Sequence, residues 1–208
     1  KVPGIEYIRL LYLYPDEISD ELIDFIASNK KVAPYFDIPF QHSSDSILKA
    51  MYRRGDKESY QLLIDKIRSK IPHAILRTTY IVGFPGETDE DFDIVIEECK
   101  KIGYSKIHTF PYSKREGTRA SMMEQVKDSD KTDRVDKMLR LSDILESKYY
   151  QSFIGKELRV LVEKDYGLTD NYIKVELDKE CKENTFVTVK ISEVNGTNVK
   201  GIVIKWYN

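Results

Sequence analysis

Short β-rich runs alternate with amphipathic helical stretches through the first two-thirds of the chain. Four runs, at residues 7–13, 35–39, 74–82 and 106–112, are rich in apolar, β-branched and aromatic residues and predict strands. Between and after them, apolar residues recur at helical spacing, for example Phe92, Val95 and Cys99. Strands that alternate with helices in this way predict an α/β fold with a parallel sheet.

Capping and breaking residues indicate where several helices begin and end. A helix from about residue 57 to 70 should stop before Pro72, because the residue before a proline is biased away from the helical region. Thr88, with Asp91 three residues later, predicts a capping box at the start of the next helix. A charged amphipathic stretch over residues 128–152 predicts a long final helix.

After Gly155 the pattern changes to alternating apolar and polar residues. Four strands are predicted, in the runs ELRVLVE, YIKVELD, FVTVKIS and NVKGIVIKWY, and Asn195-Gly196 is a hairpin signal. We therefore expect two domains: residues 1–152 with the α/β fold, and residues 153–208 with a small antiparallel β-barrel or sheet.

Composition excludes several classes of protein. The chain has 208 residues, of which 41% are hydrophobic, and contains no apolar run of the roughly 18 residues that a membrane span needs. We expect a cytoplasmic protein without a membrane partner. With 33 Lys+Arg against 35 Asp+Glu, no global charge excess attracts nucleic acid, so any such binding must be local. The two cysteines, Cys99 and Cys181, are far apart and are expected to be reduced.

Polar and glycine-rich loops follow the predicted strands, where ligands bind in parallel α/β folds. They are Gln41-His42-Ser43-Ser44-Asp45, Gly83-Phe84-Pro85-Gly86-Glu87-Thr88 and Tyr112-Ser113-Lys114-Arg115. Each loop also has a purely structural interpretation. His42 could cap the next helix, and the glycines of the second loop could supply the positive φ of a turn. Lys114 and Arg115 could be a solvated basic pair. Arg77, within a strand, would need a carboxylate partner in a barrel interior, or could point outward and pair with Glu90 or Asp91. No hydrolase, Walker or zinc-peptidase motif occurs.

Taken together, these motifs resemble one family. The segments YIRLLYLYP, YFDIPFQHSSDSILKAMYRRG, ILRTTYIVGFPGETDEDF and HTFPYSKREGT, in that order, look like the radical S-adenosylmethionine methylthiotransferases, and the match covers nearly the whole chain. Asp37 and His42 resemble the RimO type, which modifies an aspartate of ribosomal small-subunit protein 12, more than the tRNA-modifying MiaB type.

The resemblance implies a partial, TIM-like α/β barrel, of which this chain would hold the last four strands, and then a TRAM domain. It also implies S-adenosylmethionine and two [4Fe-4S] clusters in the full-length enzyme. The family's C-x-x-x-C-x-x-C loop is not in this chain, and Cys99 and Cys181 cannot supply three thiolates. We therefore expect no catalytic residue and no metal ligand here, and a chain that is inactive alone.

By the same resemblance, the distal half of the cofactor and substrate site remains. Residues expected to flank the adenosine or to line the cavity are Gln41, Arg77, Thr79, Gly83, Phe84, Pro85 and Tyr112. His42, Lys114 and Arg115 are the candidates for contact with the substrate.

The sequence is compatible with three functions. The chain is part of an enzyme acting on ribosomal small-subunit protein 12 or the ribosome, part of one acting on the adenosine beside a tRNA anticodon, or a cluster-free module that binds RNA or ribosomal protein. Residues 151–208 carry nine basic and nine acidic residues, and this neutrality favours a protein substrate over tRNA. The segment GLTDNYIKVELD favours the tRNA-modifying relatives instead. An incomplete barrel would also leave an exposed strand edge, which predicts dimerisation or aggregation.

Overall fold

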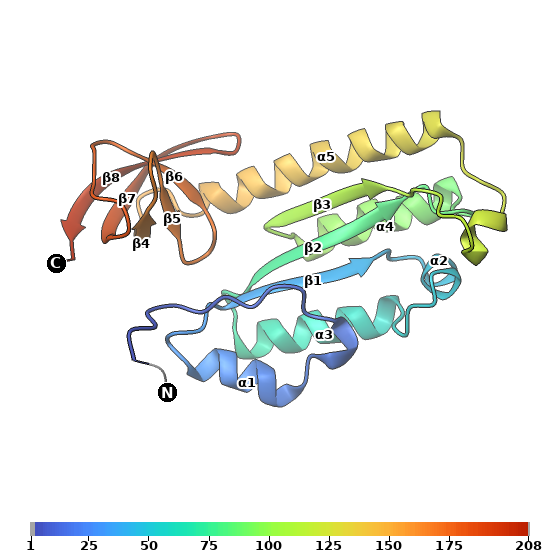
Figure 1. The fold of residues 1–208 in the computed structure, drawn as a ribbon, viewed down its shortest axis with the longest axis horizontal. Helices are drawn as coiled ribbons and strands as arrows, with labels where there is room; N and C mark the ends of the chain where they lie inside the picture. Colours follow the sequence, from blue (N-terminus) through green and yellow to red (C-terminus); the bar gives the residue numbers. More distant parts are fainter. Residues whose placement is uncertain (1–2, 208) are drawn as a thin grey trace. The chain divides into compact units, whose positions relative to one another are not determined.

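The computed structural model describes residues 3–207, and the chain divides into two compact units, Lys1–Ser142 and Asp143–Asn208 (Figure 1). The long helix α5 (Asp128–Gln151) runs across this division, so its last turns belong to the second unit. Among the described residues, no helix has the length and apolar character needed to cross a membrane.

The first unit is built on a three-stranded parallel sheet in the order β1 (Tyr35–Gln41), β2 (Ile75–Val82) and β3 (Lys106–Pro111). The register places Asp37 beside Arg77 and Thr79 beside His108. Helical segments connect the strands and complete the unit: η1 (Pro15–Glu17), α1 (Asp20–Ser28), α2 (Asp45–Ala50), α3 (Lys57–Lys70), α4 (Asp89–Ile102) and η2 (Arg119–Met122). The predicted α/β pattern is confirmed.

The two faces of the sheet differ in burial. Along β2, Thr78, Tyr80 and Val82 are buried, whereas the alternate residues Thr79 and Ile81 are only half-buried. Side chains alternate between the faces of a strand, so one face packs into the core beneath the helices and the other stays accessible. The accessible face is the one that can carry a site.

The predicted helix boundaries agree with the structure. Thr88 and Asp91 form a reciprocal capping box at the start of α4, and α3 ends at Lys70, two residues before Pro72. Helix α4 ends at Ile102, and the next residue, Gly103, caps it with φ of 65°, a left-handed conformation that glycine adopts without steric cost. Local sequence chemistry therefore fixes these ends.

The strand expected at residues 7–13 is wrong. Only an isolated bridge between Ile8 and Val32 forms there, and Leu13 N donates to Asp37 O of β1 at 2.8 Å. Tyr12 has φ of 59°, which interrupts the extended backbone that a ladder needs. The segment runs beside β1 without pairing along it, and Leu11 and Tyr12 remain exposed. The described part of the first unit therefore has three strands, not four.

Strand β3 is at the opposite edge of the sheet from β1, and a side chain of helix α5 forms hydrogen bonds with its backbone. Ile107 N donates to Ser142 Oγ of α5, and Ser142 Oγ donates to Ile107 O, both at 3.2 Å. A buried backbone group without a partner is costly, and this serine satisfies two of them. Helix α5 thus protects part of the sheet edge.

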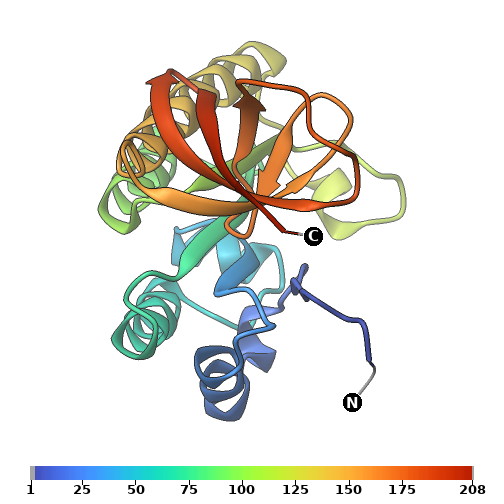
Figure 2. The same ribbon diagram turned by 90° about the vertical axis from the view of Figure 1, so that its left-hand side faces the viewer.

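The second unit contains a closed five-stranded barrel in the order β4-β5-β6-β8-β7, and Figure 2 shows these strands, orange to red, curling around one interior. Its strands are β4 (Glu157–Val162), β5 (Gly167–Thr169), β6 (Lys174–Leu177), β7 (Phe186–Asn195) and β8 (Asn198–Trp206). Two expectations are corrected. Strand β5 replaces part of an expected loop, and β6 pairs with β8 in parallel, so the barrel is not wholly antiparallel.

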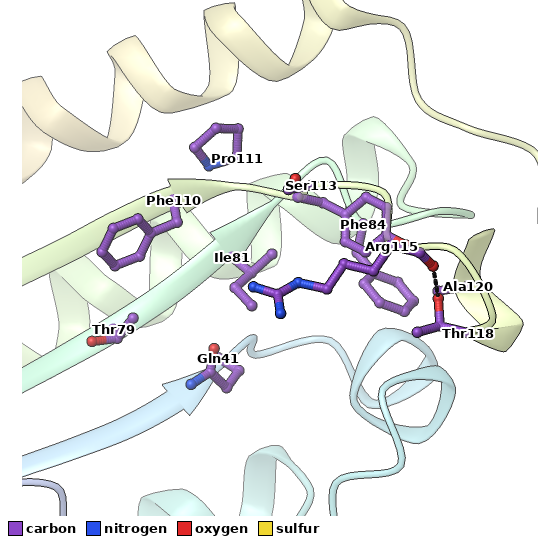
Figure 3. Close-up of a pocket in the computed structure, with 11 residues that line it drawn as sticks. Gln41, Thr79, Ile81, Phe84, Phe110, Pro111, Ser113, Arg115, Thr118 and Ala120 are labelled. Atoms are coloured by element: carbon purple, nitrogen blue, oxygen red, sulfur yellow. Dashed lines mark hydrogen bonds between the residues drawn. The ribbon is translucent and has the colours of Figure 1, made fainter.

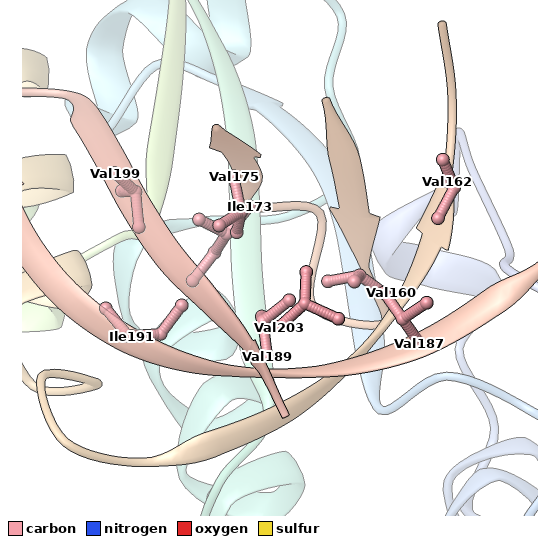
Figure 4. Close-up of a cluster of buried hydrophobic side chains, with 9 residues drawn as sticks. All are labelled: Val160, Val162, Ile173, Val175, Val187, Val189, Ile191, Val199 and Val203. Carbon is pink, nitrogen blue, oxygen red and sulfur yellow. The ribbon is translucent and has the colours of Figure 1, made fainter. Parts of the chain in front are cut away.

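Branched aliphatic side chains fill the barrel (Figure 4). They are Val160, Val162, Ile173, Val175, Val187, Val189, Ile191, Val199 and Val203. Tyr149, Tyr150 and Phe153, at and just beyond the end of α5, pack against this cluster. Gly201 allows close strand approach, because a Cβ there would lie 2.8 Å from Val175 Cγ1. The expected hairpin at Asn195-Gly196 joins β7 to β8.

Candidate functional site

The carboxyl ends of the three parallel strands surround a pocket of about 480 Å³ (Figure 3). Gln41 is the last residue of β1, Phe84 follows β2, and Tyr112 follows β3. The pocket is lined by Gln41, Thr79, Ile81, Phe84, Phe110, Pro111, Tyr112, Ser113, Arg115, Thr118 and Ala120. Parallel strands bring their carboxyl ends to one edge, which is why three distant segments meet here.

The pocket has an apolar wall and a few polar groups. The rings of Phe84 and Tyr112 meet edge to face, with centroids 5.1 Å apart. Figure 3 shows Gln41 and Thr79 on the strands below and Arg115 reaching across the pocket from the loop after β3. Among the described residues, no carboxylate forms an ion pair with the Arg115 guanidinium. A flat apolar ligand that carries polar and anionic groups matches this lining.

The pocket continues into a basic groove. A neighbouring hollow of about 320 Å³ shares Gln41, Phe84 and Tyr112 with it and adds Arg53 and Arg119. Beyond lies a hollow of about 560 Å³ lined by Ser46, Lys49, Ala50, Tyr52, Arg53, Arg119 and Met123. No acidic residue is among these lining side chains. The groove therefore offers a positively charged approach to the pocket.

The structure brings together five of the residues singled out from the sequence. Gln41, Thr79, Phe84, Tyr112 and Arg115 all line the pocket. Gly83 and Pro85 lie on either side of Phe84 in the chain but do not line the pocket. Lys114 is exposed and lies next to Arg115 in the chain.

Sequence reasoning missed several pocket residues, among them Ile81 and Phe110. A signal was present, because Ile81 lies two positions after Thr79 and therefore on the same face of β2. The register then places Phe110 beside Ile81.

Arg77 lies on the accessible face of the sheet but outside the pocket lining. Its Nη1 donates to Asp37 Oδ2 at 3.1 Å, and its Nη2 donates to His108 Nε2 at 2.9 Å. The carboxylate partner that a sheet arginine requires is therefore supplied by the neighbouring strand. The alternative pairing with Glu90 or Asp91 is wrong.

His42 and Glu87 are buried together beside the pocket. The side chain of His42 has no exposed surface, and its Nε2 lies 3.3 Å from Glu87 Oε2. Glu87 Oε2 also accepts the backbone N–H of Gly83 at 2.8 Å and of Phe84 at 3.3 Å. Arg134 of α5 donates from Nη1 to Glu87 Oε1 at 2.7 Å. His42 thus contacts the protein itself in this structure.

A second carboxylate ties the same two loops together. Asp91 Oδ1 accepts from Ser44 Oγ at 2.5 Å and from Ser46 Oγ at 3.0 Å, and Oδ2 accepts from the Thr88 backbone N–H at 3.0 Å. Partial burial by itself raises the pKa of Asp91, but these donated hydrogen bonds outweigh it and the net pKa is lowered. The loops after β1 and β2 are therefore held to each other at two points.

The two cysteines are not joined in a disulfide. Cys99 is buried in α4, and Cys181 is half-buried in the second unit; both are free. Burial raises the pKa of the Cys99 thiol to about 12. Within residues 3–207 no three or more metal-ligating side chains are grouped.

Comparison with known proteins identifies the family. Residues 4–99 match the model of the radical SAM superfamily. The protein named ribosomal protein uS12 methylthiotransferase RimO from Clostridium kluyveri is 40% identical over 98% of this chain and 48% of its own length. Its namesakes from Alkaliphilus oremlandii and Aquifex aeolicus are 38% and 36% identical, each over 97% of this chain and 50% of their own length.

A solved structure of the radical S-adenosylmethionine methyltransferase TsrM from Kitasatospora setae has a TM-score of 0.41 and 16% identity, over 49% of this chain and 20% of that one. The sequence relatives are decisive, and the chain spans about half of their length. By sequence, this chain belongs to the RimO-type family of radical SAM methylthiotransferases.

Proposed function

We propose that this chain is part of a methylthiotransferase that uses S-adenosylmethionine to modify an aspartate of ribosomal small-subunit protein 12. The observation that carries the proposal is the pocket at the carboxyl ends of β1, β2 and β3. It is lined by residues from the segments that resemble this family, and the relatives bear the name of that activity.

The residues of the pocket fit S-adenosylmethionine. Phe84, Ile81 and Phe110 give an apolar surface suited to an adenine ring, while Gln41 and Thr79 offer polar groups to the nucleoside. Arg115 is the cation suited to a carboxylate. When bound, S-adenosylmethionine supplies radical chemistry in this family. The task of these side chains is to bind it, orient it and exclude water.

The residues of this chain do not fit an iron–sulfur cluster. Three thiolates are required, and the two cysteines lie in different units, one of them buried in a helix. We therefore propose that the two clusters of the complete enzyme are bound by segments outside residues 1–208, and that this chain has no activity alone.

We propose a protein substrate rather than tRNA. Residues 151–208 carry equal numbers of acidic and basic residues, which gives no excess charge for gripping phosphates. Arg115, which lines the pocket, and the exposed Lys114 beside it are the candidates for substrate contact. His42 is buried against Glu87 beside the pocket, so we propose that it stabilises the site and does not contact the substrate. We further propose that the three-stranded sheet is part of a TIM-like barrel, that the five-stranded barrel is a TRAM domain, and that the protein is cytoplasmic.

The pocket assignment is tested by binding to this chain. Isothermal titration calorimetry with S-adenosylhomocysteine should detect binding, and Thr79→Val should weaken it by removing one hydroxyl. Thr132→Val, on the exposed surface of α5, is the matched control and should bind like the wild type. Equal affinity of all three proteins would remove Thr79 from the site.

The substrate is tested with the full gene product that contains this chain. After anaerobic reconstitution with iron and sulfide, it is incubated with S-adenosylmethionine, a reductant, ribosomal small-subunit protein 12 and bulk tRNA, and both are analysed by mass spectrometry. We expect a methylthio group on the protein's aspartate. Methylthioadenosine in the tRNA would instead establish the tRNA activity, and no product on either would favour a binding module without chemistry.

A further inference from the structure

The carboxylate of Glu87 is a buried hub between three segments of the chain. Its side chain has no exposed surface and accepts hydrogen bonds from the backbone N–H groups of Gly83 and Phe84, from His42 and from Arg134. A buried carboxylate is costly unless it is paired and fully hydrogen-bonded, and here both conditions are met. The hub therefore fixes the relative positions of the loops after β1 and β2 and of α5.

The hydrogen bonds of His42 define its tautomer. Its Nδ1 lies 2.9 Å from the backbone N–H of Ser44 and accepts from it. A ring nitrogen that accepts carries no proton, so the proton of the neutral ring is on Nε2, which donates to Glu87. His42 is therefore neutral and connects the loop after β1 to the loop after β2 through its hydrogen bond with Glu87.

Arg134 supplies the balancing charge from α5. Its Nη1 contacts Glu87, and its Nη2 donates to Asp89 Oδ1 at 2.8 Å. Burial by itself lowers the pKa of this guanidinium, but Asp89 and Glu87 outweigh it and the net pKa is raised. Its side chain is 7% exposed, so water screens the pair with Glu87 only weakly.

Each loop held by the hub presents a pocket residue directly beside it. Gln41 precedes His42, and its φ of 74° is a conformation that a residue with a side chain adopts only when its surroundings enforce it. Gly83 has φ of 70°, and the next residue, Phe84, places its ring in the pocket. The hub thus fixes the backbone conformation next to Gln41 and next to Phe84, two residues whose side chains line the pocket.

We propose that Glu87, His42 and Arg134 are positioning residues that hold Gln41 and Phe84 in the ligand-binding geometry. None of the three lines the pocket, and they act through the backbone of the two loops. The contacts of Glu87 are all made by groups of the chain itself, so they can hold both loops in one geometry and lower the cost of ordering them on binding. The effect on S-adenosylmethionine binding rests on the function proposed above.

The first test compares Arg134→Gln with Arg140→Gln in the full chain. Arg140 is an exposed residue of the same helix, so it controls for the loss of one arginine. We expect Arg134→Gln to weaken S-adenosylhomocysteine binding by about tenfold or more, the scale of loss seen when a residue that orients a metal ligand is removed. The comparison is made at a temperature where circular dichroism shows a folded chain. Arg134→Lys, which keeps the charge, should recover part of the affinity. Wild-type affinity in folded Arg134→Gln would overturn the proposal.

The second test needs no ligand and so separates this proposal from the proposed function. Amide hydrogen exchange followed by nuclear magnetic resonance should show protected amides at Gly83 and Phe84, and Arg134→Gln should speed their exchange while the amides of β2 stay protected. The ¹⁵N shifts of His42 should report the neutral tautomer with its proton on Nε2. Fast exchange at both amides in the wild type, or the other tautomer, would refute the hub even if the ligand binds.

Where Arg134→Gln fails to fold, His42→Gln decides. Glutamine keeps an N–H donor of similar reach, and His42→Leu removes it. The positioning role predicts tighter S-adenosylhomocysteine binding by His42→Gln than by His42→Leu. If the wild type binds no probe but the amides of Gly83 and Phe84 are protected, the proposed function fails and the hub stands.

Discussion

At the scale of single residues, two buried carboxylates of the first unit are paired with arginines from distant segments. Asp37, which is 3% exposed, pairs with Arg77 of the next strand, and Glu87 pairs with Arg134 of α5. Removing one partner of such a pair leaves a buried charge alone and typically costs about 3–5 kcal/mol. These pairs therefore constrain the fold strongly around the pocket.

The cysteines give a prediction at this scale. Burial and the raised pKa of Cys99 should keep it unreactive toward a thiol reagent, since the thiolate is the reactive form, and this should hold from neutral pH to about pH 10. Cys181 is only half-buried and should react. Ellman titration should count one fast thiol in the folded chain and two in denaturant. Two fast thiols in the folded chain would show that α4 opens readily.

Contacts of single residues that were predicted from the sequence are confirmed where the partner is close along the chain. The Thr88–Asp91 capping box needs only three residues of sequence, and it forms as expected. Arg77 has its carboxylate partner 40 residues away on a neighbouring strand, so the sequence left its direction open. His42 likewise meets Glu87 only after β1 and β2 are side by side.

At the scale of elements, the edges of the parallel sheet are treated differently. Residues 7–13 run beside β1 with few hydrogen bonds, whereas β3 is bonded to Ser142 of α5. The expected association through an exposed edge stays a prediction for β1. At β3, the helix side chain takes up the hydrogen-bonding capacity of Ile107.

Ser142→Ala tests this edge contact. The change leaves the buried N–H and C=O of Ile107 without their partner, and we expect a loss of about 1–3 kcal/mol in the free energy of unfolding. Ser69→Ala, at an exposed position of α3, is the matched control and should change stability by less than about 0.5 kcal/mol. Urea unfolding measures both. Equal stability of the two variants would mean that water replaces the serine.

At the scale of the whole molecule, the chain consists of two units with separate cores. The barrel closes on itself, so none of its strands is left with an open edge. Its aliphatic interior comes from its own strands and from Ile173, which directly precedes β6. Tyr149, Tyr150 and Phe153 pack on this interior, which explains why the end of α5 belongs with the barrel.

The barrel should therefore fold alone. We expect residues 143–208, expressed separately, to unfold cooperatively in urea and to give a dispersed amide spectrum, because closure satisfies its backbone groups and its core is complete. Val189→Asp, which places a charge in the core, should abolish this transition, whereas Lys190→Asp, at the next and exposed position, should not. A disordered wild-type fragment would show that the barrel depends on the first unit.

The sequence by itself determined the alternation of strands and helices, the helix ends at Thr88 and before Pro72, the hairpin at Asn195-Gly196 and the motifs of the family. These features depend on periodicity and on contacts within a few residues. Tertiary structure alone decided that residues 7–13 do not form a strand, that β6 and β8 are parallel, that Ile81 and Phe110 join the pocket, and that His42, Glu87 and Arg134 meet. Each of these depends on which distant segments are adjacent, and local sequence patterns do not specify adjacency.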